Sequence, residues 1–321
     1  MRILVTGGAG YIGSHMVKLL KLNGHDITTI DDLSTGHQDA VLAGTLIEGS
    51  LLNTELLETV VSAKIYDVVI HFAGSISVGE SVTNPSKYYR NNLVASLNLL
   101  DVLSKHGVNK LVFSSTAAIF GNPQYVPIDE SHPKVPINPY GETKLMFEQA
   151  LASYEKEYGL KSVSLRYFNA SGADPEGELG ERHDPETHLI PLALRATSPA
   201  KTALTIFGND YDTKDGTCVR DYVHVMDLCE AHLLAIDHLI SGGDSRQYNL
   251  GNGEGYSVLE VIQTVERITG KMVNVCFGPN RLGDPASLVA DSANIRNHWG
   301  WEPKYNLEEI VRHAWRWESE P

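Results

Sequence analysis

The sequence has little cysteine, few basic residues and no long apolar run. Its three cysteines are too few and too scattered for a disulfide framework or a CxxC metal site, which favours a reduced, cytoplasmic setting. No apolar run approaches the roughly 20 residues that span a bilayer. The first residues carry one basic side chain and an apolar run that glycine interrupts at once, so we expect no signal peptide.

Basic residues are outnumbered by acidic ones, 26 to 40, which gives a formal net charge of −14. Such a field repels phosphate backbones and anionic membrane surfaces, so neither nucleic acid nor a membrane is an expected partner. It also disfavours anionic small molecules. A phosphate-bearing ligand would therefore need well-placed arginines or backbone amides to bind.

Short apolar runs alternate with longer amphipathic stretches through the first half of the chain. Strands and helices in this order build βαβ units, and we therefore expect a doubly wound α/β fold with a parallel sheet. The texture changes near residue 170, because glycine, proline and acidic residues crowd residues 171–185. The sequence thus predicts a first domain over residues 1–170 and a smaller α/β domain over 171–321, from which some chain returns to the first sheet.

Three glycines follow the first apolar run with the spacing GxxGxxG: Gly7, Gly10 and Gly13. Between a strand and a helix, glycine lets the backbone approach a pyrophosphate, whose charge the helix N-terminus stabilises. Asp31 ends the next apolar run, 18 residues after Gly13, where a carboxylate accepts the ribose hydroxyls of NAD and repels the 2′-phosphate of NADP. The plainer alternatives are a tight turn at the glycines and a loop cap at Asp31 or Asp32.

Tyr140 and Lys144 lie four positions apart behind Pro139, and so share one face of a helix that begins near the proline. A nearby ammonium, together with the positive charge of an oxidised nicotinamide, lowers the pKa of a phenol from about 10, which makes Tyr140 a candidate general base. An isolated pair of this kind is better explained by a solvated helix face. This pair is not isolated, because the apolar run that begins at Lys110 ends in three hydroxyl residues, of which Thr116 is the last.

The glycine triplet, the hydroxyls and the tyrosine–lysine pair together resemble the extended short-chain dehydrogenase/reductase family. Further segments are similar to those of its UDP-glucose (UDP-galactose) 4-epimerases: residues 71–74, 79–81, 166–169, 207–211, 219–225, 248–251 and 283–285. The resemblance covers nearly the whole chain. It implies a Rossmann-like NAD-binding domain that carries the catalytic pair and a C-terminal domain that mainly binds the substrate.

The resemblance also implies a reaction. Tyr140 removes the proton from the 4-hydroxyl of a UDP-hexose while hydride passes from C4 to NAD, and the 4-keto sugar then turns over and takes the hydride back on its other face. Thr116 hydrogen-bonds the reacting oxygen, and Lys144 orients the nicotinamide ribose. UDP-glucose and UDP-galactose are thereby interconverted with no net redox change.

The resemblance assigns the remaining site residues. Those assigned to the cofactor are Gly7, Gly10, Tyr11, Ile12, Gly13, Asp31, Asp32, Phe72, Ala73, Gly74, Asn91, Ser114, Tyr140, Lys144 and Tyr167. Those assigned to the UDP-sugar are Thr116, Tyr140, Asn169, His188, Leu189, Phe207, Arg220, Arg281, Asp284 and Leu288. The helices expected at residues 88–105 and 140–158 form a dimer interface in the family, so a homodimer is expected.

The chain departs from the family pattern at a few positions. Ser50 replaces an aspartate that contacts the adenine, which leaves open how the adenine is held. Ser75 and Ile76 stand where some members carry a lysine near the cofactor phosphates. His188 replaces an asparagine, so the role of its side chain is uncertain. Leu288 is smaller than the tyrosine of strict hexose enzymes, and we hypothesise some activity on UDP-N-acetylhexosamines.

Several other functions stay open. A 4,6-dehydratase needs an acid after the strand-end threonine, and Ala117 and Ala118 do not supply one. Other nucleotide-sugar 4-epimerases, acting on UDP-GlcNAc, pentose or uronate sugars, are alternatives, as is a silent NAD-binding regulator. His183, Asp184 and His188 have neither helical nor CxxC ligand spacing, and the hydride chemistry needs no metal, so none is expected.

Overall fold

The computed structural model describes residues 1–198, 202–281 and 284–319. Contacts within the chain divide it into two compact units. The first unit comprises Met1–Gly121, Lys134–Arg166 and Cys229–Tyr248, and the second comprises Asn122–Pro133, Tyr167–Leu228 and the chain from Asn249 onward. The chain therefore passes between the units several times. The functional roles expected for a first domain over residues 1–170 and a second over 171–321 remain predictions.

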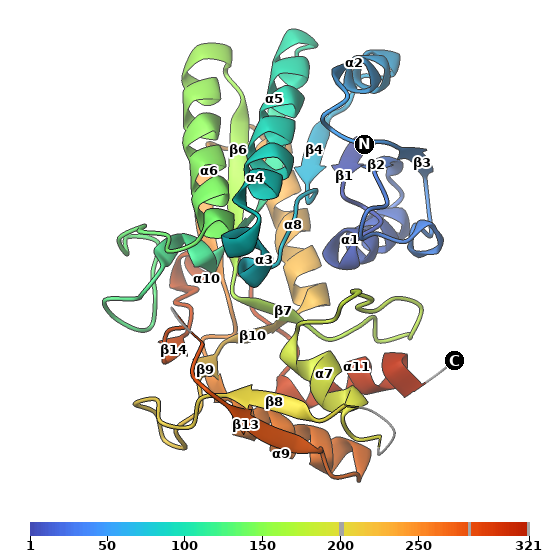
Figure 1. Ribbon diagram of the computed structural model, residues 1–321. Helices are drawn as coiled ribbons and strands as arrows, with labels where there is room; N and C mark the ends of the chain where they lie inside the picture. The colour runs from blue at the N-terminus through green and yellow to red at the C-terminus, as the bar shows by residue number, and fades with distance from the viewer. Residues whose placement is uncertain (199–201, 282–283, 320–321) are drawn as a thin grey trace. The chain divides into compact units, whose positions relative to one another are not determined.

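A seven-stranded sheet organises the first unit (Figure 1). In spatial order its strands are β11 (Arg246–Leu250), β6 (Lys161–Tyr167), β5 (Lys110–Thr116), β4 (Val68–His71), β1 (Arg2–Thr6), β2 (Asp26–Asp31) and β3 (Thr45–Glu48). Neighbouring strands from β5 to β3 pair in parallel, with Ile3 opposite both Ile27 and Val68. The strand order reverses between β1 and β4, which is where ligands bind in doubly wound sheets. The predicted α/β fold class is confirmed.

The central strands of the sheet are buried almost end to end. Such burial is typical of a parallel sheet that is covered on both faces. Helices α1 (Tyr11–Leu22), α2 (Thr54–Ala63), α5 (Ala95–Lys105) and α6 (Pro139–Tyr158) belong to this unit, with most of α8 (Val225–Ile240). On one face, Leu111 and Phe113 of β5 share a core with Leu57 of α2, Leu99 of α5 and Phe147 of α6. Helices α5 and α6 run side by side over this core (Figure 1).

Between β4 and α5 the chain forms two short helices and an irregular turn. These are α3 (Val78–Thr83), α4 (Pro85–Tyr88) and the π-helical segment η2 (Tyr89–Val94). A π-helical turn inside helical structure often marks a functional site, because its extra residue changes the direction of the side chains. Here η2 packs against α6, the helix that carries the tyrosine–lysine pair.

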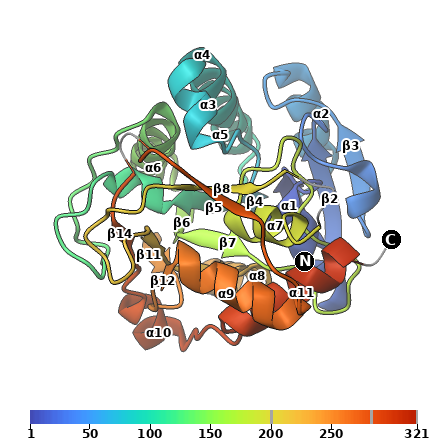
Figure 2. The same ribbon diagram turned by 60° about the horizontal axis from the view of Figure 1, so that its bottom comes forward.

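Three small sheets and four helices make up the described part of the second unit (Figure 2). The sheets pair β7 (Asn169–Ser171) with β10 (Tyr222–His224), β8 (Leu204–Phe207) with β13 (Val275–Gly278), and β9 (Val219–Arg220) with both β12 (Tyr256–Ser257) and β14 (Ser287–Leu288). The helices are α7 (Leu189–Arg195), α9 (Val258–Thr269), α10 (Ala293–Trp299) and α11 (Leu307–Ser319).

Helices α7, α9 and α11 enclose the core of the second unit (Figure 2). Their buried residues include Ile190, Val261 and Ile310, which pack with Ile206 of β8. Ser257 caps α9: its hydroxyl accepts from the amide of Glu260, whose carboxylate accepts from the amide of Ser257. Among the helices of the described ranges, none is both long and apolar enough to cross a membrane.

Candidate active site

The three glycines lie in the turn between β1 and α1, and two of them are required by packing within the chain. Gly7 has φ +74°, and a Cβ there would lie 2.5 Å from the amide nitrogen of Ala73. A Cβ on Gly13 would lie 2.1 Å from the carbonyl oxygen of Gly7. Glycine at these positions lets the turn, the helix and the end of β4 approach one another.

Gly10 has no such reason within the chain. A Cβ at this position would meet its nearest neighbour, the oxygen of Gly7, at 3.5 Å, which is an ordinary contact. Gly10 is also the N-cap of α1, where it offers no side chain, and the first turn of α1 carries no acidic residue. Tyr11 and Ile12 open the helix. The free helix N-terminus fits an anion such as a pyrophosphate that approaches the backbone closely.

Asp31 ends β2 beside this turn, as the sequence predicted. Its two carboxylate oxygens accept from the amides of Ala9 and Leu33, each at 2.9 Å. Burial raises the pKa of Asp31, and these two hydrogen bonds oppose that effect. The carboxylate is therefore held in place by the loop and keeps lone pairs for a ribose. Asp32 is exposed and accepts instead from the amide and hydroxyl of Ser34.

The segment after β4 joins the cofactor side of the site to the catalytic helix. The amides of Phe72 and Ala73 both donate to the oxygen of Thr6 in β1. Beyond them, a Cβ on Gly74 would lie 3.1 Å from Oδ1 of Asn92 and 3.7 Å from Nζ of Lys144. The end of β4, η2 and α6 therefore meet at Gly74.

The residue of η2 that organises this meeting is Asn92, the neighbour of Asn91, whose contact with the cofactor stays a prediction. Asn92 accepts from the amide of Ser75 at 2.7 Å, and it donates to the oxygen of Ser75 at 2.9 Å and to Oγ1 of Thr143 at 3.4 Å. Asn91 makes one longer bond, 3.3 Å to Oγ of Ser75. A buried amide with three partners fixes the segment after β4 against α6.

Helix α6 begins where the sequence predicts. Asn138 is its N-cap and accepts from the amide of Gly141, and Pro139 is the first helical residue. A Cβ on Gly141 would lie 2.4 Å from the oxygen of Ala118, just beyond β5. Glycine here lets the start of α6 approach the end of β5, which brings Tyr140 to Thr116.

Burial raises the pKa of Tyr140, and a side-chain hydrogen bond with Thr116 opposes the effect. The lowered phenol pKa expected from the sequence is thus not found in the protein alone, because desolvation of the phenolate outweighs its neighbours. Thr116 also accepts from the amide of Ala118 at 3.1 Å, which fixes its hydroxyl.

Lys144 lies one turn further along α6 and is buried. Its Nζ donates to the main-chain oxygen of Ser114 at 2.9 Å and lies 4.9 Å from the ring centroid of Phe113. Burial lowers the pKa of Lys144 to about 8, against the opposing charge of Glu148. The predicted catalytic set of Tyr140, Lys144 and Thr116 is therefore brought to one end of β5.

Sequence reasoning missed the buried ion pair beneath this set. Glu148 of α6 accepts from Nε and Nη2 of Arg166 at 3.0 and 2.7 Å and from the hydroxyl of Ser115 at 2.6 Å. Because Glu148 is four residues after Lys144, the ion pair fixes the same face of α6 against β5 and β6. The available signal was an arginine that directly follows the alternating apolar residues Val163 and Leu165 of β6.

Within the second unit, several residues assigned to the UDP-sugar contact one another or stand opposite one another in paired strands. Arg220 donates to Oδ1 of Asp284 at 2.6 Å and to the oxygen of Pro285 at 2.9 Å. Leu288 stands opposite Arg220 in the pairing of β14 with β9. The guanidinium of Arg281 lies 4.0 Å from the ring centroid of Phe207. Gly283, in the motif at residues 283–285, lies outside the described residues.

Asp221, the neighbour of Arg220, is a buried carboxylate that was missed as well. Its buried carboxylate accepts from the amides of Asn252, Gly253 and Ala290 at 2.7 to 3.1 Å. Burial raises the pKa of Asp221 to about 6, although these hydrogen bonds oppose the effect. The main-chain oxygen of Asp221 accepts from both the amide and the side chain of Asn169 at 3.0 Å.

The other predicted positions are placed as follows. Tyr167 ends β6, and Ser50 accepts from the amide of Leu52 in the turn after β3. His188 is the N-cap of α7 without a capping hydrogen bond, and Leu189 is the first residue of that helix. Nδ1 of His188 instead contacts Oε1 of Glu181.

The parallel sheet, the glycine turn and the tyrosine–lysine pair at the end of β5 define a Rossmann-like enzyme that binds a dinucleotide. The chain belongs to the NAD dependent epimerase/dehydratase family, which matches residues 3–251. It is 50% identical to a UDP-glucose 4-epimerase of Halalkalibacterium halodurans over 321 residues, which cover 100% of this chain and 96% of the relative.

Solved structures agree with this assignment. The UDP-glucose 4-epimerase of Brucella ovis in complex with NAD superposes with a TM-score of 0.95 at 48% identity, covering 98% of this chain and 97% of that one. The UDP-Glc/GlcNAc 4-epimerase of Campylobacter jejuni superposes with a TM-score of 0.86 at 42% identity, covering 99% and 98%. The resemblance drawn from the motifs is confirmed.

Proposed function

We propose that this chain inverts C4 of a UDP-hexose and thereby interconverts UDP-glucose and UDP-galactose. The observation that carries the proposal is the close approach of α6 to the end of β5: Nζ of buried Lys144 donates to the main-chain oxygen of Ser114, and Gly141, next to Tyr140, lies against Ala118. A proton-transfer group fixed beside a second hydroxyl suits a reaction that begins at a sugar hydroxyl. The family membership and the epimerase relatives support the same function.

The residues present fit NAD. Gly10 leaves room for a pyrophosphate at the start of α1, and the carboxylate of Asp31 is positioned to accept hydrogen bonds from the hydroxyls of a ribose. NAD, when bound, supplies an acceptor for the hydride from C4 and returns that hydride to the 4-keto sugar. Tyr140 takes the proton from the 4-hydroxyl and later gives it back, while Thr116 holds the same oxygen. Lys144 places a positive charge near the phenol and orients the nicotinamide ribose.

Residues of the second unit suit the nucleotide part of the substrate. Arg220 and Arg281 supply the positive charge that an acidic protein needs for a diphosphate, and Phe207 offers a ring face for a uracil. Asp284 is suited to accept from a ribose hydroxyl. Asn169, His188 and Leu189 are proposed contacts of the phosphates and the sugar.

Activity on UDP-N-acetylhexosamines is a second proposal. Leu288 of β14 is smaller than tyrosine and stands opposite Arg220 of β9. The relative from Campylobacter jejuni, a UDP-Glc/GlcNAc 4-epimerase, is consistent with such breadth.

We also propose a cytoplasmic homodimer. Helices α5 and α6 lie side by side and carry exposed apolar residues near their ends, Val94 just before α5 and Tyr158 at the end of α6. Light scattering during gel filtration tests this: twice the chain mass is expected, and a monomer at micromolar concentration contradicts it.

The experiment for the main function uses the purified chain as it is. One portion is denatured and the released nucleotide identified; a second is given UDP-galactose and followed by NMR. Release of NAD and equilibration to UDP-glucose are expected. A 4-keto-6-deoxy product would instead indicate a dehydratase, and absence of turnover with NAD still bound would indicate a regulator.

A further inference from the structure

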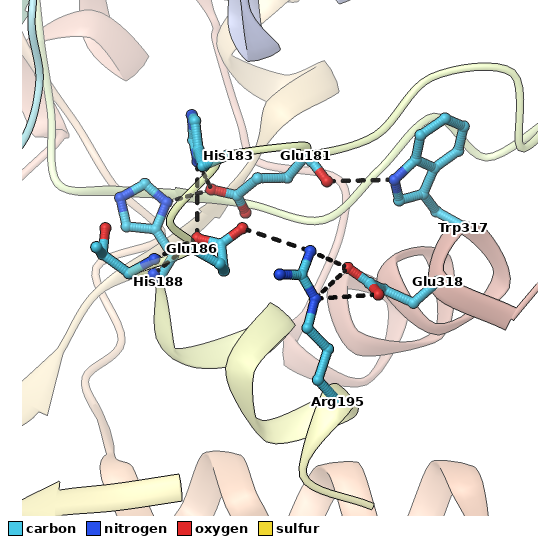
Figure 3. Close-up of polar contacts among 8 residues, drawn as sticks. Glu181, His183, Glu186, His188, Arg195, Trp317 and Glu318 are labelled. Atoms are coloured by element: carbon cyan, nitrogen blue, oxygen red, sulfur yellow. Dashed lines mark hydrogen bonds and ion pairs between the residues drawn. The ribbon is translucent and has the colours of Figure 1, made fainter. Parts of the chain in front are cut away.

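Four side chains that can bind metal converge in the segment before α7. Glu181, His183, Glu186 and His188 each offer one ligand atom, and these atoms all lie within 4.8 Å of one another (Figure 3). The four residues come from eight consecutive positions of the second unit. The cluster includes none of the catalytic residues Tyr140, Lys144 and Thr116, although His188 is also a proposed substrate contact.

The two histidines approach the same carboxylate from different directions. Nδ1 of His183 lies 3.0 Å from Oε1 of Glu181, and Nδ1 of His188 contacts the same oxygen. Their rings are nearly perpendicular, at 86°, with centroids 5.2 Å apart. Glu186 completes the group, since its Oε1 lies 3.7 Å from Nδ1 of His183. Nitrogen and oxygen atoms that converge from separate directions suit a four-coordinate ion.

The carboxylates of this cluster are buried, so their negative charge needs a partner of opposite charge. The side chains of Glu181 and Glu186 are only 5% and 2% exposed. Oε2 of Glu186 accepts no hydrogen bond from any residue of the described ranges. Nη2 of Arg195 lies 3.9 Å from it, beyond hydrogen-bond distance, and is bound by Glu318 at 2.9 Å on the far side (Figure 3). Buried carboxylates require a compensating cation.

We propose that this cluster binds one divalent transition-metal ion, with zinc as the preferred ion. Imidazole nitrogen and carboxylate oxygen are zinc ligands at about 2.0 to 2.2 Å, whereas magnesium and calcium prefer oxygen alone. His188 is 44% exposed, which leaves a path of entry. The competing occupant of the site is a proton on each imidazole, which would leave two ordinary ion pairs.

The ion would cross-link residues 181–188, and thereby stabilise the loop directly before Leu189, the first residue of α7. The loop is also anchored by Nε1 of Trp317, which donates to the main-chain oxygen of Glu181 at 3.3 Å. The proposal departs from the expectation of no metal, which rested on ligand spacing and on the hydride chemistry and did not include Glu181 and Glu186.

The test begins with tag-free protein treated with a chelator and dialysed against Zn²⁺ at micromolar concentration. We expect about one zinc per chain by elemental analysis and a rise in Tm that grows with zinc concentration. With Co²⁺ as the probe, intense visible absorption of a four-coordinate ion is expected. Absence of bound zinc, or only the weak spectrum of a six-coordinate ion, overturns the proposal.

Variants separate this site from adventitious binding at the surface. Glu186→Gln and His183→Asn are each expected to lower zinc affinity at least 10-fold while far-UV circular dichroism stays unchanged. The matched control is Glu176→Gln, at an exposed residue of the acidic trio Asp174, Glu176 and Glu178, of which only Asp174 is buried; this variant should bind like the unmodified chain. Equal zinc binding by all three variants overturns the proposal. Should either cluster variant fail to fold, the cobalt spectrum of the unmodified chain decides.

Discussion

Nζ of Lys144 donates a 2.9 Å hydrogen bond to the main-chain oxygen of Ser114, and thereby joins α6 to the end of β5. This bond places the ammonium beside the strand that ends in Thr116, close to the start of α6, which carries Tyr140. The buried pair of Glu148 and Arg166 supports the same face of the helix. The catalytic set is thus fixed by contacts within the first unit.

The glycine turn allows a direct separation of folding from cofactor binding. Gly10→Ala should change the free energy of unfolding by no more than about 1 kcal/mol, because its Cβ has room. It should lower NAD affinity at least 10-fold. Gly13→Ala should destabilise the fold by about 1 to 3 kcal/mol or more, because its Cβ meets the oxygen of Gly7. Denaturant unfolding measures the change in stability, and the NAD content of the purified variants measures the change in NAD binding. Equal NAD content in Gly10→Ala and the unmodified chain would contradict the proposed role of Gly10.

Removing one member of the buried ion pair should be costly. Glu148→Gln leaves the guanidinium of Arg166 without its charged partner, and we expect a loss of about 3 to 5 kcal/mol in the free energy of unfolding. Exchanging the exposed Glu157 on the same helix for glutamine provides the control and should change stability by less than about 0.5 kcal/mol. Equal effects of the two changes would show that the buried pair has no special role.

Asp221 should make stability depend on pH in an unusual direction. Burial raises its pKa from an ordinary 3.8 to about 6 in the folded chain, so the folded chain holds this proton more tightly than the unfolded chain. Its contribution to stability is therefore fully present below about pH 4 and is lost as the pH rises to about 6. The loss is on the order of 3 kcal/mol. Tm measured from pH 4 to 7 should fall by less over this range in Asp221→Asn than in the unmodified chain; parallel curves would contradict the raised pKa.

The sequence predicted the regular parts of this molecule well. Strands with continuous apolar runs, the glycine turn, Asp31 at the end of β2 and the start of α6 near Pro139 all depend on local patterns. Asn92, Glu148 and Asp221 were missed because each acts through partners far along the chain. The partner of Glu148 is 18 residues away, and Ala290 is 69 residues from Asp221. Buried polar residues of this kind carry no periodic signal.

Leu288 offers a test of substrate breadth. If its smaller side chain leaves room for an N-acetyl group, the unmodified chain should turn over UDP-N-acetylglucosamine. Leu288→Tyr should then lower kcat/KM for that substrate at least 10-fold and leave UDP-galactose within about 3-fold, because only the group at C2 differs. Coupled assays with both substrates measure the ratio. Turnover of UDP-galactose alone by the unmodified chain would refute the hypothesis.

The most direct test of the account is the turnover of UDP-galactose by Tyr140→Phe, compared with the unmodified chain at equal NAD content. Loss of the proton-transfer group should lower kcat by about 10² to 10⁴, with NAD still released on denaturation and the fold intact by circular dichroism. Undiminished turnover by Tyr140→Phe would contradict the assignment of Tyr140 as the acid–base residue.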